Sequence, residues 1–360
     1  MSKKVIGFFS GVGGIELGFQ RVGCEVIWSN EFDSKAQETF KANFDSELNT
    51  EDVRNLEETD IPMADIVVGG FPCQSFSHTG RMKGFEDERG NLFFEIIRLI
   101  KKQKPRVLFF ENVKHLENHD GGNTFKVIKG ALEELGYQVK HKVINTLDHN
   151  IPQNRERIFI VAFREKVDYD YFSFPMSEEL TTTIHSFADF KGEVPAKYYY
   201  TEQRHKFYPK MKETMTKSTT TYQWRRDYTR ENKSGVCPTL TANMGTGGNN
   251  VPIILTNHGI RKLTPRECFN FQGFPQDFVL PEIADSHLYK QSGNTVTVPV
   301  VEKIANQILQ ALFLGDLAGI QNYEGGLTHD NTSDKTCGRT WEVETGIKQE
   351  GSSKTSSISL

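Results

Sequence analysis

The stretch Phe8-Phe9-Ser10-Gly11-Val12-Gly13-Gly14 decides the fold, because of what lies on either side of it. The apolar run of residues 5–9 predicts a β-strand, and the apolar spacing of residues 15–22 predicts a helix. Glycines between a strand and a helix let the backbone turn tightly and approach a ligand at the helix N-terminus. On its own, the stretch fits a plain tight turn as well as a site for a nucleoside cofactor.

Strand-like and helix-like segments alternate from residue 1 to about residue 163. This alternation predicts an α/β fold, a doubly wound, mostly parallel sheet of the Rossmann-like type with helices on both faces. No helix separates the last two expected strands, so we expect one of them to be antiparallel. Strands are expected at residues 5–9, 25–29, 65–68, 106–110, 139–144 and 157–163, and helices at 15–22, 34–43, 92–102 and 123–135.

The chain has 360 residues, more than one compact core usually organises, so we expect more than one domain. Residues 1–170 would form the α/β domain. Residues 171–260, rich in Thr, Tyr, Asn, Gly and Lys, predict a smaller irregular domain of loops and short strands. Residues 261–315 return to the first domain, with a helix start at Thr264-Pro265-Arg266-Glu267 and an amphipathic helix at 298–313. The polar residues 316–360 predict a disordered tail.

Charge is unevenly distributed along the chain. The formal net charge is -4, yet residues 197–233 hold ten basic and four acidic side chains, which suits a nucleic acid. The five cysteines are scattered without a Cys-x-x-Cys pair, which indicates a reducing cytoplasm and no zinc site. No apolar stretch approaches the roughly 20 residues that cross a bilayer. We therefore expect a cytoplasmic protein with no membrane segment and no metal.

Two further loops carry reactive side chains. Pro72-Cys73 follows the strand expected at 65–68, which puts a thiol at the sheet edge where ligands bind in open α/β folds. A free Cys needs nearby positive charge or a helix N-terminus to become a reactive thiolate, and is otherwise a small buried hydrophobe. We adopt the second interpretation for the other four cysteines. Glu111 ends the strand expected at 106–110, where desolvation raises a carboxyl pKa and lets the group donate a proton near neutrality.

These loops belong to a series of six short motifs. In this order and spacing they resemble the cytosine-specific DNA methyltransferases of bacterial restriction–modification systems, over about residues 4–314. Each motif is modest alone, and the fixed order makes the signal strong. The motifs are Phe9-Ser10-Gly11-Val12-Gly13-Gly14, Pro72-Cys73-Gln74, Glu111-Asn112-Val113, Gln153-Asn154-Arg155-Glu156-Arg157, Arg266-Glu267 and Gly293-Asn294-Thr295-Val296.

The resemblance implies four catalytic residues, Cys73, Glu111, Arg155 and Arg157. Carbon 5 of cytosine is a poor nucleophile because the ring is electron-poor. If Cys73 adds to carbon 6 while Glu111 hydrogen-bonds or protonates ring nitrogen 3, carbon 5 becomes enamine-like and can accept a methyl group. Arg155, with Arg157 behind it, would polarise the exocyclic oxygen and fix Glu111, a task that suits a planar guanidinium.

The same resemblance implies S-adenosylmethionine as the cofactor. Phe9 and Phe32 would pack on it, Glu31 would hold its ribose, and Asp52, which fits the spacing better than Asp60, would accept from the adenine amino group. One departure stands out, since the family usually has an acidic residue where this chain has Gly7. The implied cofactor set is Phe9, Ser10, Gly11, Val12, Gly13, Gly14, Glu31, Phe32, Asp52, Val53, Pro72, Leu92, Asn294 and Val296.

A cytosine inside a duplex is out of reach, so the resemblance also implies base flipping. Residues 171–260 correspond in position to the family's variable target recognition domain, and residues 235–242 resemble its shared core. We expect its basic side chains to contact phosphates of double-stranded DNA and its Thr and Arg side chains to contact base edges. The candidates are Arg225, Arg226, Thr239 and Thr241. We expect a monomer that works with a restriction endonuclease.

Three other functions would each explain part of this sequence. A transferase acting on tRNA is the closest alternative, because one branch of the family methylates RNA with the same catalytic residues; the large variable domain favours duplex DNA. A DNA-binding regulator that kept the fold without catalysis is disfavoured by the intact Cys73 and Glu111. A dinucleotide oxidoreductase would explain the glycine loop and leave the Pro72-Cys73 step unexplained.

Overall fold

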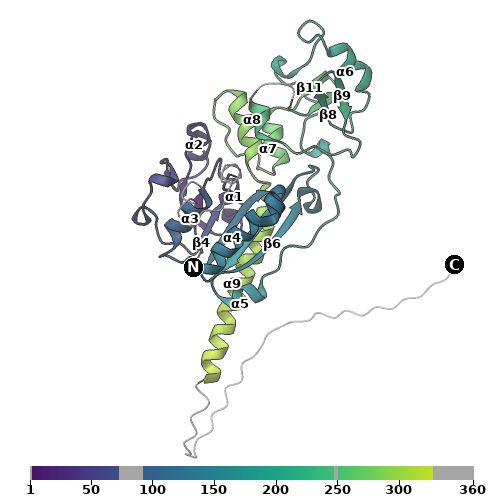
Figure 1. Ribbon diagram of the computed structural model, residues 1–360. Coiled ribbons are helices and arrows are strands. Elements are labelled where there is room, and N and C mark those ends of the chain that lie inside the picture. The colour runs from purple at the N-terminus through teal and green to yellow at the C-terminus, as the bar shows by residue number, and fades with distance from the viewer. Residues whose placement is uncertain (1, 73–91, 247–249, 327–360) are drawn as a thin grey trace, which may run out of the picture. The chain divides into compact units, whose positions relative to one another are not determined.

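Two β-sheets organise the chain, of which the computed structural model describes residues 2–72, 92–246 and 250–326 (Figure 1). The larger sheet has seven strands in the order β3-β2-β1-β4-β5-β7-β6. The predicted elements of this part are all present, within three residues of the expected bounds, and β3 and α5 are additional. The strands are β1 Lys4–Phe8, β2 Glu25–Asn30, β3 Glu47–Asn49, β4 Ile66–Gly69, β5 Val107–Val113, β6 Gln138–Asn145 and β7 Glu156–Phe163, and the helices are α1 Gly14–Arg21, α2 Ser34–Lys41, α3 Leu92–Ile100, α4 Asn123–Glu134 and α5 Lys166–Tyr171.

Strand direction changes at one edge of this sheet. The pairs β3–β2, β2–β1, β1–β4 and β4–β5 are parallel, whereas β7 is antiparallel to both β5 and β6. The prediction that one of the last two strands is antiparallel is confirmed. A helical crossover is needed only between parallel strands, so the short connection between β6 and β7 is sufficient.

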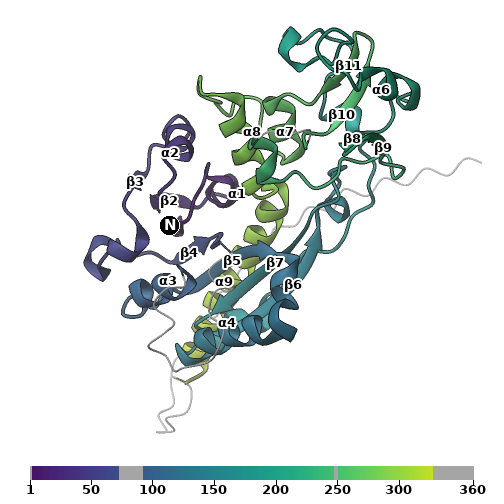
Figure 2. The same cartoon turned by 45° about the horizontal axis from the view of Figure 1, so that its top comes forward.

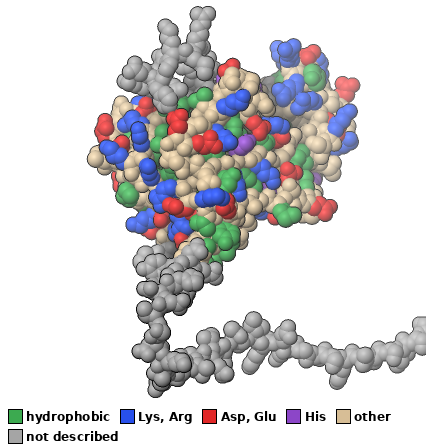
Figure 3. Space-filling model, turned by 60° about the horizontal axis from the view of Figure 1, so that its bottom comes forward, with side chains coloured by type: hydrophobic (Ala, Val, Ile, Leu, Met, Phe, Trp, Pro, Cys, Tyr) green, Lys and Arg blue, Asp and Glu red, His purple; other side chains and the backbone are tan. Residues whose placement is uncertain are grey.

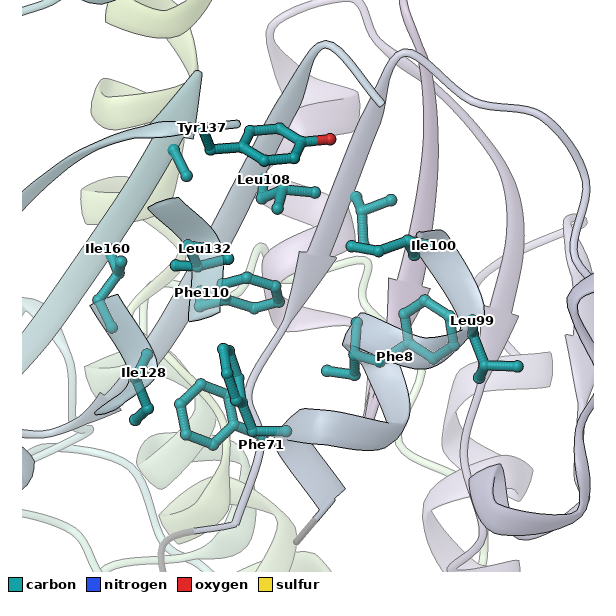
Figure 4. Packing of buried hydrophobic residues seen from close by; sticks show 14 of the residues in the cluster. Phe8, Phe71, Leu99, Ile100, Leu108, Phe110, Ile128, Leu132, Tyr137 and Ile160 are labelled. Carbon is teal, nitrogen blue, oxygen red and sulfur yellow. The ribbon is translucent and has the colours of Figure 1, made fainter. Parts of the chain in front are cut away.

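Both faces of the large sheet are buried, as alternate residues of β5 show. Leu108 and Phe110 pack with residues of α3 and α4, and Figure 4 shows Phe110 among Phe71, Ile128 and Leu132. Val107 and Phe109 belong to a second cluster with α1 and with the helix α9 (Val298–Gly326). Figure 2 shows α4 and α9 on opposite sides of the sheet. This arrangement confirms the predicted doubly wound α/β fold.

The smaller sheet is antiparallel and has four short strands in the order β11-β10-β8-β9. They are β8 Tyr222–Arg225, β9 Tyr228–Glu231, β10 Ile253–Thr256 and β11 Gly259–Lys262, with the helix α6 Tyr208–Thr214 beside them. Phe207 stacks on Trp224 with ring centroids 4.5 Å apart. β11 runs across residue 260, the predicted end of the irregular domain, so the small sheet extends two residues past that position. The sequence predicted short strands here but not a four-stranded sheet, because each strand is only four residues long.

Two helices lead from the small sheet towards α9. Thr264 caps α7 (Pro265–Phe271) and forms a reciprocal capping box with Glu267, so the predicted helix start is confirmed. The helix α8 (Asp285–Asn294) was not predicted, because its sequence is mostly polar. It forms where Leu288, Tyr289 and Gln291 are buried, so tertiary packing decides it.

The helix α9 continues to Gly326, well past the predicted end near residue 313. The predicted disorder of residues 316–360 is therefore wrong for 316–326, while residues 327–360 lie outside the described part of the chain. One reason is Asp316, which accepts a hydrogen bond of 2.6 Å from Arg106 one turn beyond the expected end. In the described residues, no helix combines the length and apolar character needed to cross a bilayer.

Candidate active site

A cavity of about 620 Å³ opens at the carboxyl ends of β1, β2, β4 and β5. Ligands of open α/β sheets bind at this edge, because the loops that follow parallel strands meet there. Eleven of the predicted site residues line the cavity. They are Phe9, Ser10, Gly11, Val12, Gly14, Glu31, Pro72, Glu111, Arg157, Asn294 and Val296.

The glycine loop forms one wall of the cavity. Phe9 follows β1 in the left-handed region, with φ 54°, a conformation that costs free energy for a residue with a side chain. Gly13 has φ 84° and is the N-cap of α1, where a side chain would be strained. The loop is tied to the next strand, since the Ser10 N–H donates to the Asn30 carbonyl at 3.0 Å. The chain thus holds a strained turn at this sheet edge.

Glu31 lies beside the loop, directly after β2. Its Oε2 accepts from the Gly11 N–H at 2.7 Å, and its Oε1 accepts from the Asp33 N–H at 2.6 Å. Burial raises the pKa of Glu31, although these N–H donors favour the charged form. A carboxylate has about four acceptor positions, so two remain after these bonds. Glu31 can therefore hold the turn and still accept hydroxyl groups.

Five residues of the predicted cofactor set do not line the cavity. Gly13 and the exposed Phe32 lie next to residues that do. Asp52 caps the 3-10 turn Val53–Asn55 and pairs with Arg54, while Val53 is buried in the core. Leu92 begins α3 and packs against the core beside it. The structure thus gives Asp52, Val53 and Leu92 contacts within the protein.

The loop after β4 is fastened to β5. The buried Asn112 donates from Nδ2 to the Phe71 carbonyl at 2.8 Å, just before Pro72. Pro72 lines the cavity, and Cys73, the predicted nucleophile, lies outside the described residues. Asn112 therefore positions the last described residues before Cys73.

Glu111 and Arg157 form an ion pair at the cavity wall. Glu111 pairs with Phe159 across the β5–β7 ladder, so Arg157 is its diagonal neighbour on the same face. Arg157 Nε lies 3.0 Å from Glu111 Oε1. Burial raises the pKa of Glu111, and the nearby guanidinium groups of Arg157 and Arg155 oppose that shift. A buried carboxyl with a raised pKa can hold and deliver a proton near neutral pH.

Arg155 is placed differently from the prediction. It was expected at the reacting ring with Arg157 behind it, but Arg157 lines the cavity and Arg155 is fully buried behind it. Arg155 donates to the carbonyls of Leu240, Gly293 and Thr295, at 2.8, 3.1 and 2.5 Å. These bonds hold the backbone on both sides of Asn294, so Arg155 supports the cavity wall.

The DNA-binding candidates lie in and next to the smaller sheet. Arg225 and Arg226 are exposed at the turn between β8 and β9, and Arg225 and Arg230 both donate to Gln223 Oε1. Figure 3 shows Lys and Arg side chains gathered on the lobe that carries these strands in Figure 1.

The two threonine candidates are already engaged within the chain. Thr239 Oγ1 donates to the Asn154 carbonyl at 2.6 Å, and Thr241 bonds the Asn243 side chain. Their hydroxyls therefore brace local backbone, and their remaining lone pairs are acceptors.

Comparison with known proteins identifies the family. The family profile described as C-5 cytosine-specific DNA methylase matches residues 3–310. The chain belongs to this family. It is a DNA (cytosine-5-)-methyltransferase, and its relatives come from bacterial restriction–modification systems.

Two relatives show how far the similarity of this methyltransferase extends. It is 55% identical over 312 residues to the Type II methyltransferase M.Bsp6I of Bacillus sp. (strain RFL6), with 86% of this chain and 99% of that protein covered. It is 40% identical over 316 residues to M1.ScrFI of Lactococcus lactis subsp. cremoris, with coverage of 86% and 78%.

Solved structures confirm the fold of this methyltransferase. A mutant DNMT2 of Spodoptera frugiperda superimposes with a TM-score of 0.66 at 18% identity, covering 86% of this chain and 100% of that one. EhMeth of Entamoeba histolytica gives 0.64 at 17% identity, covering 87% and 99%. At this level of identity, the likeness concerns the fold alone.

The methyltransferase also has site residues that sequence reasoning missed. Asp33 and Lys290 line the cavity and are 2.6 Å apart, which joins the start of α2 to α8. Gln291 accepts from Thr39 at 2.9 Å and strengthens the same junction. Asp33 could have been noticed as the N-cap of α2, but nothing local in the sequence indicates its partner 257 residues away. Among the described residues, no cluster of metal-ligand side chains is present.

Proposed function

We propose that this enzyme transfers a methyl group from S-adenosylmethionine to carbon 5 of a cytosine flipped out of duplex DNA, through a covalent adduct with Cys73. One observation carries the proposal. The Glu111–Arg157 pair and the glycine loop line one cavity, next to Pro72, the residue before Cys73. A proton donor for the ring and a turn suited to a nucleoside therefore occupy one space.

The residues of the cavity fit the proposed cofactor. The strained Phe9 presents an aromatic ring at the end of β1, and Glu31 has acceptor positions left for the ribose hydroxyls. Asn294 and Val296 would close the pocket from the C-terminal segment. When bound, the cofactor supplies an electrophilic methyl carbon on a sulfonium.

Catalysis would then follow from the chain's own groups. The Cys73 thiolate forms a bond to carbon 6, and the electron pair displaced through the ring is stabilised as Glu111 delivers a proton or hydrogen bond to nitrogen 3. Carbon 5, now enamine-like, would form a bond to the methyl carbon, while the bond from that carbon to sulfur would break and leave its electron pair on the sulfur. A base then removes the carbon-5 proton, and its electron pair re-forms the 5,6 double bond and expels the thiolate. Arg157 keeps Glu111 oriented throughout.

Trapping tests the covalent step. Duplex DNA that contains 5-fluorocytosine at the target should hold the enzyme in a denaturation-resistant complex, because fluorine cannot leave as the proton does. Transfer of a tritiated methyl group to DNA, RNA or neither separates the DNA enzyme from the RNA alternative and from a non-catalytic binder. Labelled RNA with unlabelled DNA would refute the proposed substrate, and turnover without a trapped adduct would refute the Cys73 intermediate.

The wider role follows from the relatives. Their names describe Type II methyltransferases, so we propose that this enzyme acts as a cytoplasmic monomer that protects DNA from a cognate restriction endonuclease, with residues 171–260 reading the sequence. DNA from cells that express the chain should resist a subset of methylation-sensitive nucleases. Cleavage by every nuclease of a broad panel would contradict protection.

A further inference from the structure

A buried carboxylate lies beneath the glycine loop, where the chain lacks the family's acidic residue at position 7. Glu16, on the first turn of α1, is 1% exposed. A methyl group added at Gly7 would lie 2.0 Å from Glu16 Oε1, far inside contact distance, and 2.9 Å from Ser10 Oγ. The space that a side chain at position 7 would enter is therefore taken by the carboxylate of Glu16 and the hydroxyl of Ser10.

The surroundings of Glu16 do not explain it as a structural residue. Its Oε2 has no hydrogen-bond partner among the described residues, although the group is buried. A buried carboxylate without full hydrogen bonding destabilises a fold, and Gln or an apolar side chain would serve packing better. Burial raises the pKa of Glu16 to about 7, while the neighbouring Ser10 hydroxyl and the N–H of Glu16 itself favour the charged form. Among the described residues, Ser10 Oγ also lacks a hydrogen-bond partner. A buried carboxylate that lacks a hydrogen bond in this way indicates a functional role for Glu16.

Few charged groups surround Glu16. Glu31, after β2, raises its pKa by repulsion. Glu111 of β5 lies across Gly70 from Ile15, the residue before Glu16. On α9, Glu302 is paired with Arg21 at the far end of α1, and on α8, Lys290 is paired with Asp33. Within the described residues, Glu111 and Asp33 thus each have a paired cation, whereas Glu16 and Glu31 have none.

We propose that Glu16 is a positioning residue of the cofactor site, which supplies from α1 the carboxylate missing at Gly7 and, when ionised, holds Ser10 and the glycine loop ready for a cationic cofactor. The inference rests on the proposed use of S-adenosylmethionine, which carries a sulfonium charge. Ser10 lines the cavity and Glu16 does not, so Glu16 acts through the loop. Because a cation favours ionised neighbours, cofactor binding should expel a proton from this cluster near neutral pH.

Calorimetric titration of the full chain with S-adenosylmethionine from pH 6 to 8.5 tests the inference. The wild type should bind more tightly as pH rises through about 7. Glu16→Gln should bind about tenfold more weakly at pH 8 and lose that pH dependence, whereas Glu16→Asp should keep part of it. Glu302→Gln, the same change on the neighbouring helix, should behave as the wild type. Melting temperatures without cofactor show that each variant is folded.

A charge swap gives a second readout. Gly7→Asp alone should lower the melting temperature, because the new side chain meets Glu16. Gly7→Asp combined with Glu16→Ala should restore the melting temperature relative to Gly7→Asp alone, and cofactor affinity relative to Glu16→Ala alone. An unchanged affinity and pH profile in Glu16→Gln, or no rescue by the swap, would overturn the inference while leaving the proposed function intact. A wild type that does not bind S-adenosylmethionine would overturn both.

Discussion

Arg157 Nε lies 3.0 Å from Glu111 Oε1, and both side chains line the cavity at the carboxyl ends of the parallel strands. The pair joins β5 to the antiparallel strand β7. Burial raises the pKa of Glu111 and the guanidinium lowers it, with burial the larger influence. Arg157 therefore limits how far the pKa of Glu111 rises above that of an ordinary carboxyl group.

Replacing Arg157 should change both the rate and its pH dependence. Arg157→Ala should lower kcat/KM about 100-fold, since a positioned proton donor contributes on that order. Loss of the cation raises the pKa of Glu111 further. If the protonated form is active, activity is lost as pH rises through that pKa, so the descending limb of the pH–rate profile should move to higher pH. Arg157→Lys is the control that keeps the charge and should leave the limb near its wild-type position. A descending limb that stays in place in Arg157→Ala would show that Glu111 does not set it.

Replacing Arg155 should reduce stability more than Arg157→Ala does. Arg155→Ala leaves the buried carbonyls of Leu240, Gly293 and Thr295 without donors. Each unsatisfied buried group costs on the order of 1–3 kcal/mol, so a loss of about 3 kcal/mol or more in the free energy of unfolding is expected. Arg157 is partly exposed, with 16% of its side-chain surface accessible, and its removal should cost less, about 1 kcal/mol. Urea unfolding of both variants decides, and equal losses would contradict the supporting role of Arg155.

The fold could be predicted from the sequence because its signals are local. The strand β5 is apolar from Val107 to Phe110, where it is buried on both faces, and the glycine loop lies between a strand and a helix. Glu111 could be placed for the same reason, since a strand end in a parallel sheet faces the ligand edge. These features depend on a few neighbouring residues, which the sequence displays directly.

The remaining features depend on distant parts of the chain. Arg155 and Arg157 look alike in the sequence, and only the carbonyls near residues 240 and 293–295 separate their roles. The polar helix α8 forms because its inner side is buried, and the Asp33–Lys290 pair joins segments 257 residues apart. No local pattern reports such contacts. Glu16 likewise resembles an ordinary acidic residue of a first helical turn. Only the fold shows that its carboxylate occupies the space beside Gly7.

The stability of the cofactor-free protein should carry the signature of Glu16. Its pKa is about 7 in the fold, against an ordinary value of 4.5 for a free Glu side chain, so the folded state binds more protons between these pH values. The contribution of Glu16 to the free energy of unfolding is then fully present below about pH 4.5. It is lost as pH rises through about 7, by on the order of 3 kcal/mol. Glu16→Gln should lack this loss and gain on the wild type at pH 8. Urea unfolding at pH 5 and pH 8 measures the difference, with Glu302→Gln as control. Parallel profiles for wild type and Glu16→Gln would rule out a buried, titrating Glu16.

Cys73→Ser should abolish methyl transfer while leaving cofactor binding near normal. A serine hydroxyl is hardly ionised at neutral pH and cannot match the attack of a thiolate on carbon 6. The buried Cys237 provides a matched control, because Cys237→Ser should affect stability and not the covalent step. Tritium transfer and cofactor titration on the two variants measure these effects. Appreciable turnover by Cys73→Ser would exclude it as the nucleophile.

The turn between β8 and β9 should contribute to DNA binding. Arg225 pairs with Tyr228 at the end of the ladder, and Arg226 occupies the left-handed region with φ 50°, an unusual conformation for a residue with a side chain. Both side chains are exposed, with Arg225 also bonded to Gln223. Replacing both by Ala keeps a Cβ at each position, so the backbone strain is retained, while both charges and the Arg225–Gln223 hydrogen bond are removed.

If both arginines contact phosphate, the double Ala variant should bind all DNA sequences more weakly. The slope of log affinity against log salt should shrink by about one for each lost contact. If one arginine reads a guanine edge, the loss should instead concentrate at one base position, at about 1–3 kcal/mol.

A control with the same change in net charge replaces Lys101 and Lys102 by Ala. Both are exposed and follow α3 of the α/β part of the chain. An alternative in which the hairpin only braces the fold predicts a lower melting temperature with an unaltered slope. Binding of both double variants across a salt series, with melting temperatures, distinguishes these outcomes, and a normal affinity with a normal slope would remove Arg225 and Arg226 from the DNA interface.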